Sequence, residues 1–377
     1  MTVGLDSLAP LEQAGRAVGV RERLDAAGCE ALLVTDLTNV RWLTGFTGSN
    51  GWVVVSAERL TLVTDGRYTA QAAQQLGAAG VDADVVEART GARMIELVAA
   101  MVAGADRLGI EAADVTVQLH ERLTGSLPNT LVNTIGVVES GRRTKDAGEI
   151  DRIALAADIA DRALATVVAT LRAGVTEVEV RDELEREMRR LGASGPSYET
   201  IVAAGTTNAA LAHHRPCPTR LQHGDTVIID VGALVDGYHS DMTRTFVIGE
   251  PSARQSELYA LVLDAQRAGV AAVRAGVTTA ALDAACRDRI AAAGLGDWFV
   301  HGTGHGVGLL IHEDPFVGPS SDAVLQVGDV VTVEPGVYRG GFGGIRIEDL
   351  LVVTPDGCRN LTGSPKETPC PPSPPTT

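Results

Sequence analysis

Leu221-Gln-His-Gly-Asp-Thr-Val-Ile-Ile-Asp-Val-Gly232 has a counterpart 104 residues further on, Leu325-Gln-Val-Gly-Asp-Val-Val-Thr-Val-Glu-Pro-Gly336. Each stretch opens with Leu-Gln-x-Gly-Asp and continues as a short apolar run, which is typical of a buried strand. Each run ends in an acid, Asp230 in the first copy and Glu334 in the second. The pair therefore predicts two strands of similar local structure, each delivering a carboxylate at the same point.

A second repeated motif lies upstream of the first one. Arg172-Ala-Gly-Val-Thr176 recurs, 102 residues later, as Arg274-Ala-Gly-Val-Thr278, and each copy leads into a helical pattern that closes at a glycine, Gly192 or Gly294. Helices commonly end at such glycines. Because both repeated motifs occur in the same order at nearly the same offset, we interpret residues from about 147 to about 360 as two half-domains related by a pseudo-twofold axis. A duplication without any role in a functional site is the simpler alternative.

The first 140 residues have a different pattern. Helical periodicity over 11–28, 69–76 and 91–103 alternates with short β-like runs at 31–34, 52–55, 60–64 and 83–86. Such alternation predicts a separate α/β layered domain over residues 1–140. The fold class is therefore α/β (α+β) in two domains. The tail, residues 364–377, has six prolines in fourteen residues, and we expect it to be disordered.

Composition narrows the choice of partners and compartment. The 377 residues carry a net charge of −16, which disfavours nucleic acid and anionic membranes as partners. Five scattered cysteines without a Cys-x-x-Cys pair argue against a disulfide framework and against a thiolate zinc site. No apolar run reaches the roughly 18 residues of a membrane span, and the N-terminus lacks an apolar signal core. We expect a cytoplasmic protein.

Two further acids follow the repeated strands. Asp241 lies in Ser240-Asp-Met-Thr-Arg-Thr245, and Glu348 lies in Arg346-Ile-Glu-Asp349. If each half forms a hairpin with one acid on each strand, facing side chains lie about 4.5–5.5 Å apart at Cβ. Four converging buried carboxylates repel one another and lose hydration. Two divalent cations would neutralise them, whereas ordinary exposed strand acids are the alternative.

Histidines are concentrated in the same region, since seven of the eight lie between His213 and His312. His305 stands in His301-Gly-Thr-Gly-His-Gly-Val-Gly308, where the flanking glycines leave the imidazole accessible as a metal ligand. A hydrogen-bonded structural histidine is the alternative interpretation. Several carboxylates with one imidazole favour Mn²⁺, and Co²⁺, Fe²⁺ or Zn²⁺ fit the same donors.

The motifs around these residues resemble those of the pita-bread metallopeptidases, family M24. They read Asp-Val-Gly-Ala, Ser-Asp-Met-Thr-Arg-Thr, Gly-His-Gly-Val-Gly, Glu-Pro-Gly-Val-Tyr and Arg-Ile-Glu-Asp. Residues 39–51 and 64–68 resemble the creatinase-type N-terminal domain, which accompanies the Xaa-Pro dipeptidase (prolidase) and Xaa-Pro aminopeptidase branch. The resemblance covers nearly the whole chain except the tail, and it implies a pita-bread domain over residues 147–363.

Carried over by motif, the resemblance implies specific roles. The metal ligands would be Asp230, Asp241, His305, Glu334 and Glu348. The catalytic residues would be Glu334 as proton carrier with His213, His312 and Arg346, and the substrate-binding residues would be His301 and Tyr338. Relatives have proline where this chain has Ala212, and the preceding loop is one residue longer, so the choice between His213 and His214 stays open.

The function implied is hydrolysis of the Xaa-Pro bond at the N-terminus of short peptides by two divalent ions. We favour a prolidase-type dipeptidase. An aminopeptidase P acting on longer Xaa-Pro-Yaa peptides is the alternative within the class, and a metal-free creatinase-like enzyme or binding protein is the alternative outside it. The family also implies a homodimer.

Overall fold

A computed structural model describes residues 7–370. The described chain divides into two compact units, residues 10–142 and the remainder. Among the described residues, no helix combines the length and the apolar character that crossing a bilayer requires.

The first unit is a layered α/β domain. Its six-stranded sheet has the order β4-β3-β2-β1-β5-β6, in which β1 pairs antiparallel with β2 and parallel with β5. The elements are α1 Arg16–Leu24, β1 Ala31–Val34, α2 Leu37–Thr44, β2 Gly51–Val55, β3 Leu60–Thr64, α3 Thr69–Ala78, β4 Asp84–Glu87, α4 Gly91–Met101, β5 Arg107–Glu111, α5 Val117–Ser126, β6 Thr130–Thr134 and α6 Glu139–Arg143. The alternating pattern thus folds as expected, although α1 is shorter than the predicted helix.

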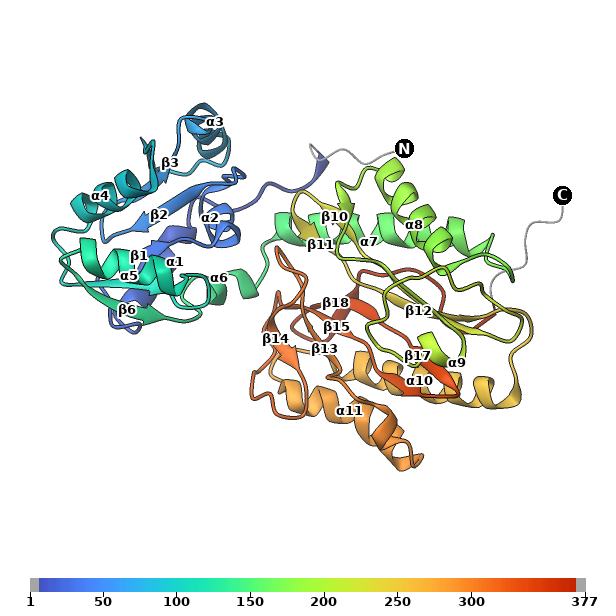
Figure 1. The fold of residues 1–377 in the computed structure, drawn as a ribbon. Helices are drawn as coiled ribbons and strands as arrows, with labels where there is room; N and C mark the ends of the chain where they lie inside the picture. The colour runs from blue at the N-terminus through green and yellow to red at the C-terminus, as the bar shows by residue number, and fades with distance from the viewer. Residues whose placement is uncertain (1–6, 371–377) are drawn as a thin grey trace. The chain divides into compact units, whose positions relative to one another are not determined.

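The second unit carries the repeated motifs. Its elements are α7 Ala147–Val168, α8 Glu177–Leu191, β7 Gly195–Pro196, β8 Ile201–Ala204, α9 Gly205–Asn208, β9 Thr226–Asp230, β10 Ala233–Val235, β11 Tyr238–His239, β12 Thr243–Val247, α10 Ala253–Ala272, α11 Thr279–Ala292, the 3₁₀ helix η2 Gly296–Trp298, β13 Gly304–Gly306, β14 Glu313–Val317, β15 Val330–Val333, β16 Gly336–Arg339, β17 Gly343–Arg346, β18 Asp349–Val353 and β19 Cys358–Asn360. In Figure 1 the strands lie between α7 and α8 on one side and α10 and α11 on the other.

The two copies of Leu-Gln-x-Gly-Asp form the same turn. Gly224 and Gly328 both have left-handed backbones, with φ of 86° and 90°, a region that glycine enters at little cost. Asp225 and Asp329 each accept a hydrogen bond from the backbone N–H three residues earlier, at 2.7 and 2.9 Å. Each half then builds its own apolar core under its own helices. The sequence repeat is therefore a repeat of local structure.

The two halves join along one seam. The Thr245 hydroxyl donates to the carbonyl of Arg346 at 2.8 Å and accepts from the Arg346 N–H at 3.0 Å. The Glu348 N–H donates to the carbonyl of Thr243 at 3.1 Å. These bonds link the strand after Asp241 in the first half to the strands around Glu348 in the second, so acids from both halves meet at the seam.

The beginning of the Pro-rich tail differs from the expectation of disorder. Arg244 Nε donates to the carbonyl of Ser364 at 3.0 Å, and Lys366 Nζ contacts Asp349 and donates to Gln266 Oε1 at 2.9 Å. Arg244 and Asp349 are buried polar groups that pair with each other at 2.9 Å, and the tail supplies a further partner for each. The prediction was therefore wrong for residues 364–370, and the rest of the tail lies outside the described residues.

Candidate metal centre

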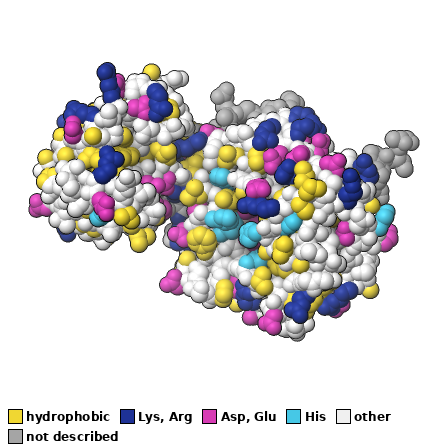
Figure 2. Space-filling model, viewed as in Figure 1, with side chains coloured by type: hydrophobic (Ala, Val, Ile, Leu, Met, Phe, Trp, Pro, Cys, Tyr) yellow, Lys and Arg dark blue, Asp and Glu magenta, His cyan; other side chains and the backbone are white. Residues whose placement is uncertain are grey.

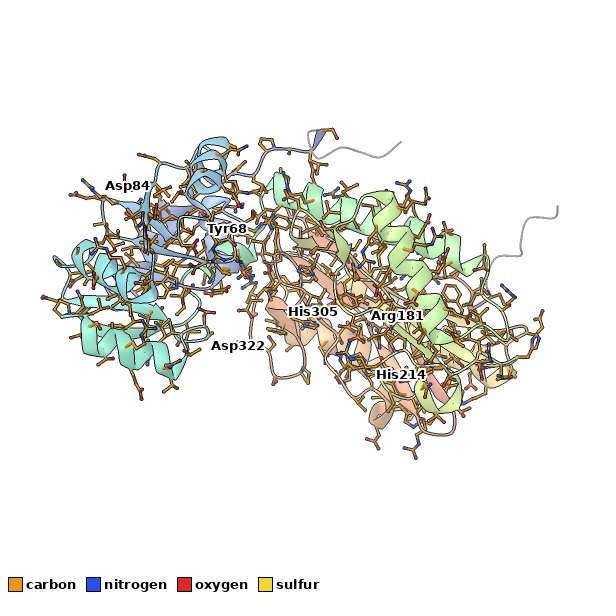
Figure 3. The ribbon with its side chains drawn as sticks, turned by 45° about the horizontal axis from the view of Figure 1, so that its top comes forward. Tyr68, Asp84, Arg181, His214, His305 and Asp322 are labelled. Carbon is orange, nitrogen blue, oxygen red and sulfur yellow. The ribbon has the colours of Figure 1, made fainter. Side chains whose placement is uncertain are left out.

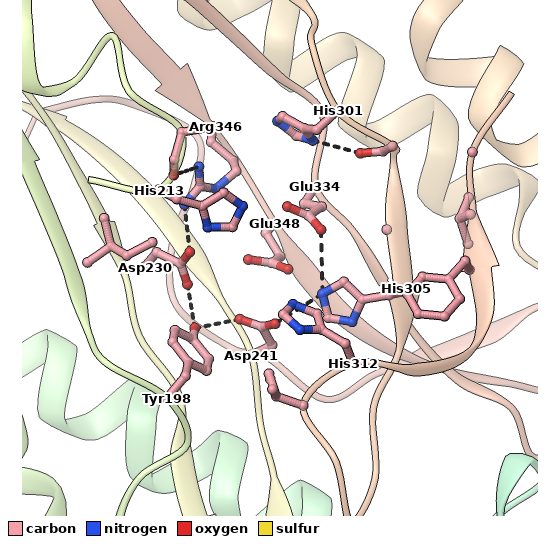
Figure 4. Close-up of a pocket in the computed structure, with 18 of the residues that line it drawn as sticks. Tyr198, His213, Asp230, Asp241, His301, His305, His312, Glu334, Arg346 and Glu348 are labelled. Carbon is pink, nitrogen blue, oxygen red and sulfur yellow. Dashed lines mark hydrogen bonds and ion pairs between the residues drawn. The ribbon is translucent and has the colours of Figure 1, made fainter. Parts of the chain in front are cut away.

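A cavity of about 870 Å³ opens on the second unit. Its walls carry nine of the ten candidate residues: Asp230, Asp241, His305, Glu334, Glu348, His213, His301, His312 and Arg346. The tenth, Tyr338, lies behind them and contacts two of them. Figure 2 shows histidine side chains gathered on one face of this unit, and Figure 4 shows the side chains converging inside the cavity.

The four acids lie at the ends of strands. Asp230 is the last residue of β9, whereas Asp241, Glu334 and Glu348 lie just outside β12, β15 and β18. The β9–β12 register pairs Asp230 with Thr243, so Asp241 is diagonal to Asp230 and not directly opposite it. In the second half, Val333 pairs with Asp349, which places Glu334 level with Glu348. Strand ends leave the carboxylates free to face the cavity.

His305 is held with one nitrogen turned toward the acids. Its Nδ1–H donates to the carbonyl of Gly306 at 3.1 Å, so Nε2 carries the lone pair in the neutral ring. Nε2 lies 3.4 Å from Asp241 Oδ2 and 3.6 Å from Glu334 Oε1. A backbone carbonyl that fixes the tautomer in this way is the usual support of a metal-binding histidine.

The glycines beside His305 are required by the packing. A Cβ on Gly304 would lie 2.1 Å from the carbonyl oxygen of Thr332, and one on Gly306 would lie 2.4 Å from that of Asp314. Real Cβ atoms do not approach backbone that closely. Glycine thus lets the short strand β13 fit between β14 and β15 and present His305 to the cavity.

Burial and mutual repulsion act on the acids together. Asp241 and Glu348 are 5% and 1% exposed. Burial, and next the charge of Asp230, raises the pKa of Asp241 well above its ordinary value. Burial, and next Asp241, raises the pKa of Glu348 in the same way, and burial also raises the pKa of Glu334. Divalent cations among these oxygens and the free His305 nitrogen would relieve this repulsion, so the donor set fits a metal centre.

Tyr198 is a member of the site that the sequence did not reveal. Its hydroxyl contacts Asp230 Oδ1 and lies 2.5 Å from Asp241 Oδ1, as the dashed lines in Figure 4 mark. Burial, and next the charge of Asp230, raises the pKa of this phenol well above its ordinary value. The phenol therefore stays protonated and orients both carboxylates. No repeat or spacing marks position 198, because the contact depends on the fold between α8 and β8.

The Arg346 side chain holds the carboxylates in position through hydrogen bonds. Its Nη2 donates to Asp230 Oδ2 at 2.6 Å and its Nε donates to Thr243 Oγ1 at 2.9 Å. The Thr243 hydroxyl in turn donates to Glu348 Oε2 at 2.7 Å. Thr243 is a second residue that the sequence did not single out. The buried Arg346 guanidinium thus positions an acid from each half. It contacts Asp230 directly and reaches Glu348 through the Thr243 hydroxyl.

The remaining candidates surround the acids. His301 Nδ1–H donates to the Gly302 carbonyl at 2.7 Å, so its Nε2 accepts from the Tyr338 hydroxyl at 3.0 Å. His312 meets His305 edge to face, with ring centroids 4.4 Å apart. His213 is exposed on the cavity wall. Its neighbour His214 also reaches that wall, but its Nε2 is paired with Glu177 at 2.8 Å. The geometry therefore presents His213 to the cavity.

Comparison with known proteins agrees with this architecture. Residues 151–355 match metallopeptidase family M24, and residues 16–144 match the Creatinase/Prolidase N-terminal domain. The chain belongs to metallopeptidase family M24, whose members bind divalent metal.

Three relatives span nearly the whole chain. An Xaa-Pro dipeptidase from Pyrococcus horikoshii is 33% identical over 92% of this chain and 96% of its own length. The structure of an Xaa-Pro dipeptidase from Bacillus anthracis has a TM-score of 0.90 and 40% identity, and the match covers 93% of this chain and 98% of that one. The structure of an X-Pro aminopeptidase from Thermotoga maritima has a TM-score of 0.83 and 35% identity, and the match covers 90% and 97%.

Proposed function

We propose that the protein hydrolyses the Xaa-Pro peptide bond at the N-terminus of short peptides, as a prolidase-type dipeptidase. The observation that carries the proposal is the convergence of four carboxylates and the His305 Nε2 lone pair on one cavity. The identities of the relatives support the substrate class, since they include Xaa-Pro dipeptidases and an X-Pro aminopeptidase.

Two divalent ions, with Mn²⁺ first among the candidates, would be held by Asp230, Asp241, His305, Glu334 and Glu348. When bound, such a pair of ions supplies an activated water at neutral pH and stabilises charge that develops on the peptide carbonyl oxygen. The oxygen-rich donor set supports Mn²⁺ over softer metals.

The chain's own residues would handle binding and proton transfer. Glu334 faces the cavity, where its carboxylate would take a proton from water and return it to the proline nitrogen. His312 and His213, which line the cavity, would donate hydrogen bonds to the carbonyl oxygen of the scissile bond. The pKa of His312 is lowered by burial and by His305, which favours a neutral donor. His301 and Tyr338 would orient the proline side of the substrate.

Substrate length distinguishes the two candidate activities. The enzyme loaded with Mn²⁺ is assayed with Leu-Pro, with the tripeptide Leu-Pro-Ala and with Leu-Ala as a control lacking proline. Hydrolysis of Leu-Pro alone supports the dipeptidase. Preference for the tripeptide supports aminopeptidase P, which the similarity to the Thermotoga enzyme favours. Cleavage of neither proline peptide by protein that contains metal would refute the proposed function.

We further propose that the protein is a cytoplasmic homodimer. The family resemblance supports the dimer, and the scattered, unpaired cysteines support a reducing compartment. Light scattering on the purified protein tests the assembly, and a mass of one chain would contradict it.

A further inference from the structure

A second cluster of metal-binding side chains lies outside the catalytic ligand set. Glu177 begins α8, and its side chain is fully buried. Its Oε2 lies 2.8 Å from His214 Nε2 and 3.3 Å from Cys217 Sγ. The three ligand atoms all lie within 4.8 Å of one another. Figure 3 shows His214 well apart from His305, so the two sets of ligands do not merge.

The Glu177 carboxylate receives more donors than it can pair well. Oε1 accepts from the Ala204 N–H at 2.8 Å and from Asn208 Nδ2 at 3.0 Å. Oε2 faces the Cys217 N–H at 3.0 Å in addition to the imidazole N–H and the thiol. A carboxylate offers about four lone-pair directions, and five donors compete for them; the thiol has a second possible partner in Thr219 Oγ1, at 3.1 Å. Replacing the imidazole and thiol protons by one cation would remove that competition.

The spacing is close to that of a zinc site. With Zn–N near 2.1 Å, Zn–S near 2.3 Å and Zn–O near 2.0 Å in a tetrahedron, the ligand atoms lie about 3.3 Å (N to O) and about 3.5 Å (S to O) apart. The corresponding distances are 2.8 and 3.3 Å. Bringing these two spacings to the zinc values takes an outward movement of about half an ångström or less. The third pair, His214 Nε2 and Cys217 Sγ, lies within 4.8 Å, against about 3.6 Å in such a tetrahedron. The His214 side chain is 11% exposed and Cys217 is half-buried, so the cluster is open to solvent on one side.

We propose that Glu177, His214 and Cys217 form a second metal site, which binds Zn²⁺ and is chemically distinct from the catalytic centre. On binding, the Cys217 thiol releases its proton to solvent as the S–Zn bond forms. The His214 proton moves from Nε2 to Nδ1, so that Nε2 can bind the ion. The Glu177 carboxylate contributes one oxygen, and water completes the tetrahedron. The amide of Asn208 lies 3.6 Å from Sγ, where it can donate to the thiolate.

Two adjacent histidines connect this cluster to the catalytic cavity. His213 and His214 are consecutive in the chain, and both line the cavity wall. We infer that an ion bound through His214 alters the position of the adjacent His213, the proposed donor for the scissile carbonyl, and so inhibits peptide hydrolysis, a consequence that rests on the proposed function.

The thiolate provides a signal that the catalytic centre cannot give, since none of its proposed ligands is a cysteine. Enzyme already loaded with Mn²⁺ is titrated with Cd²⁺, and the sulfur-to-cadmium charge-transfer band is followed in the ultraviolet. We expect the band to saturate at one equivalent in the wild type and in Cys358→Ser, which removes another half-buried thiol, and to disappear in Cys217→Ser. A band that persists in Cys217→Ser, or that never forms in the wild type, overturns the site.

Two further measurements test the metal site by chemical labelling and its effect on activity by inhibition. Zn²⁺ should protect Cys217 of the wild type from alkylation, as read by peptide mapping, and equal labelling with and without Zn²⁺ would contradict the proposal even if Cys217→Ser folded poorly. Zn²⁺ should inhibit the wild type but not Cys217→Ser. Equal inhibition of both proteins would refute the coupling to His213. The spectral and labelling results need no peptidase activity, so they stand or fall separately from the proposed function.

Discussion

Replacing Tyr198 with phenylalanine removes a single hydroxyl from the candidate metal centre and leaves the ring in place. That hydroxyl is shared by Asp230 and Asp241, which come from β9 and from the segment before β12. A hydrogen bond to a charged group contributes about 1.5–3 kcal/mol, and every 1.4 kcal/mol corresponds to about tenfold in affinity. Loss of outer partners of metal ligands typically lowers metal affinity by about 10–100-fold. We therefore expect Tyr198→Phe to bind Mn²⁺ about 10–100-fold more weakly than the wild type.

The measurement is a calorimetric titration of metal-free protein with Mn²⁺, accompanied by peptide hydrolysis at limiting and at saturating metal. Excess Mn²⁺ should restore part of the activity, because the ligands themselves remain. Tyr238→Phe is the matched control, since its hydroxyl also donates to a buried carboxylate, Glu149 Oε1 at 2.9 Å. Affinity within twofold of the wild type in Tyr198→Phe, or an equal loss in Tyr238→Phe, would refute the reasoning.

Three other predictions follow from the same geometry. Glu348→Ala should lose both bound metal, measured by elemental analysis, and turnover; full activity would contradict its role as a ligand. Gly306→Ala should lower metal affinity at least tenfold, because its Cβ would lie 2.4 Å from a backbone carbonyl of the neighbouring strand; Gly340→Ala, which meets open space, should not. Lys366→Met should lower the free energy of unfolding in urea by about 2 kcal/mol near neutral pH, because Lys366 contacts buried Asp349. Burial acts to raise the pKa of Asp349, but the cations beside it outweigh burial and lower that pKa. The stabilisation should therefore be present above the ordinary aspartate pKa and be lost as the pH falls through the folded value; a difference that does not change with pH would contradict it.

Local pattern was sufficient for much of the fold. The repeated Leu-Gln-x-Gly-Asp motif predicts a turn, and both copies form one around a left-handed glycine. Thr176 and Thr278 precede helical periodicity, and both cap helices. These features depend on residues close in the chain, so the sequence carries them directly. The same repeat located Asp230 and Glu334, because a buried strand that ends in an acid is itself a local pattern.

Contacts between segments that are distant in the chain could not be predicted from local sequence patterns. Tyr198 meets Asp230 and Asp241 across 32 and 43 residues, and no periodicity encodes such a pairing. The diagonal placement of the first two acids depends on a strand register that only the folded sheet fixes. Composition likewise suggested a disordered tail, yet Lys366 pairs with a buried aspartate whose need for a cation arises only after the core has formed.

The sequence by itself thus predicted which side chains would converge on one cavity, because acids, a histidine and glycines stand at fixed offsets within duplicated strands. Tertiary structure alone decided which nitrogen of His305 is turned toward the acids, that His214 pairs with Glu177, and that Cys217 meets the same carboxylate. The physical reason is the separation along the chain between the residues that interact. Turns, caps and strands are set by neighbours along the chain, whereas hydrogen bonds and burial in a site are set by segments that only packing brings together.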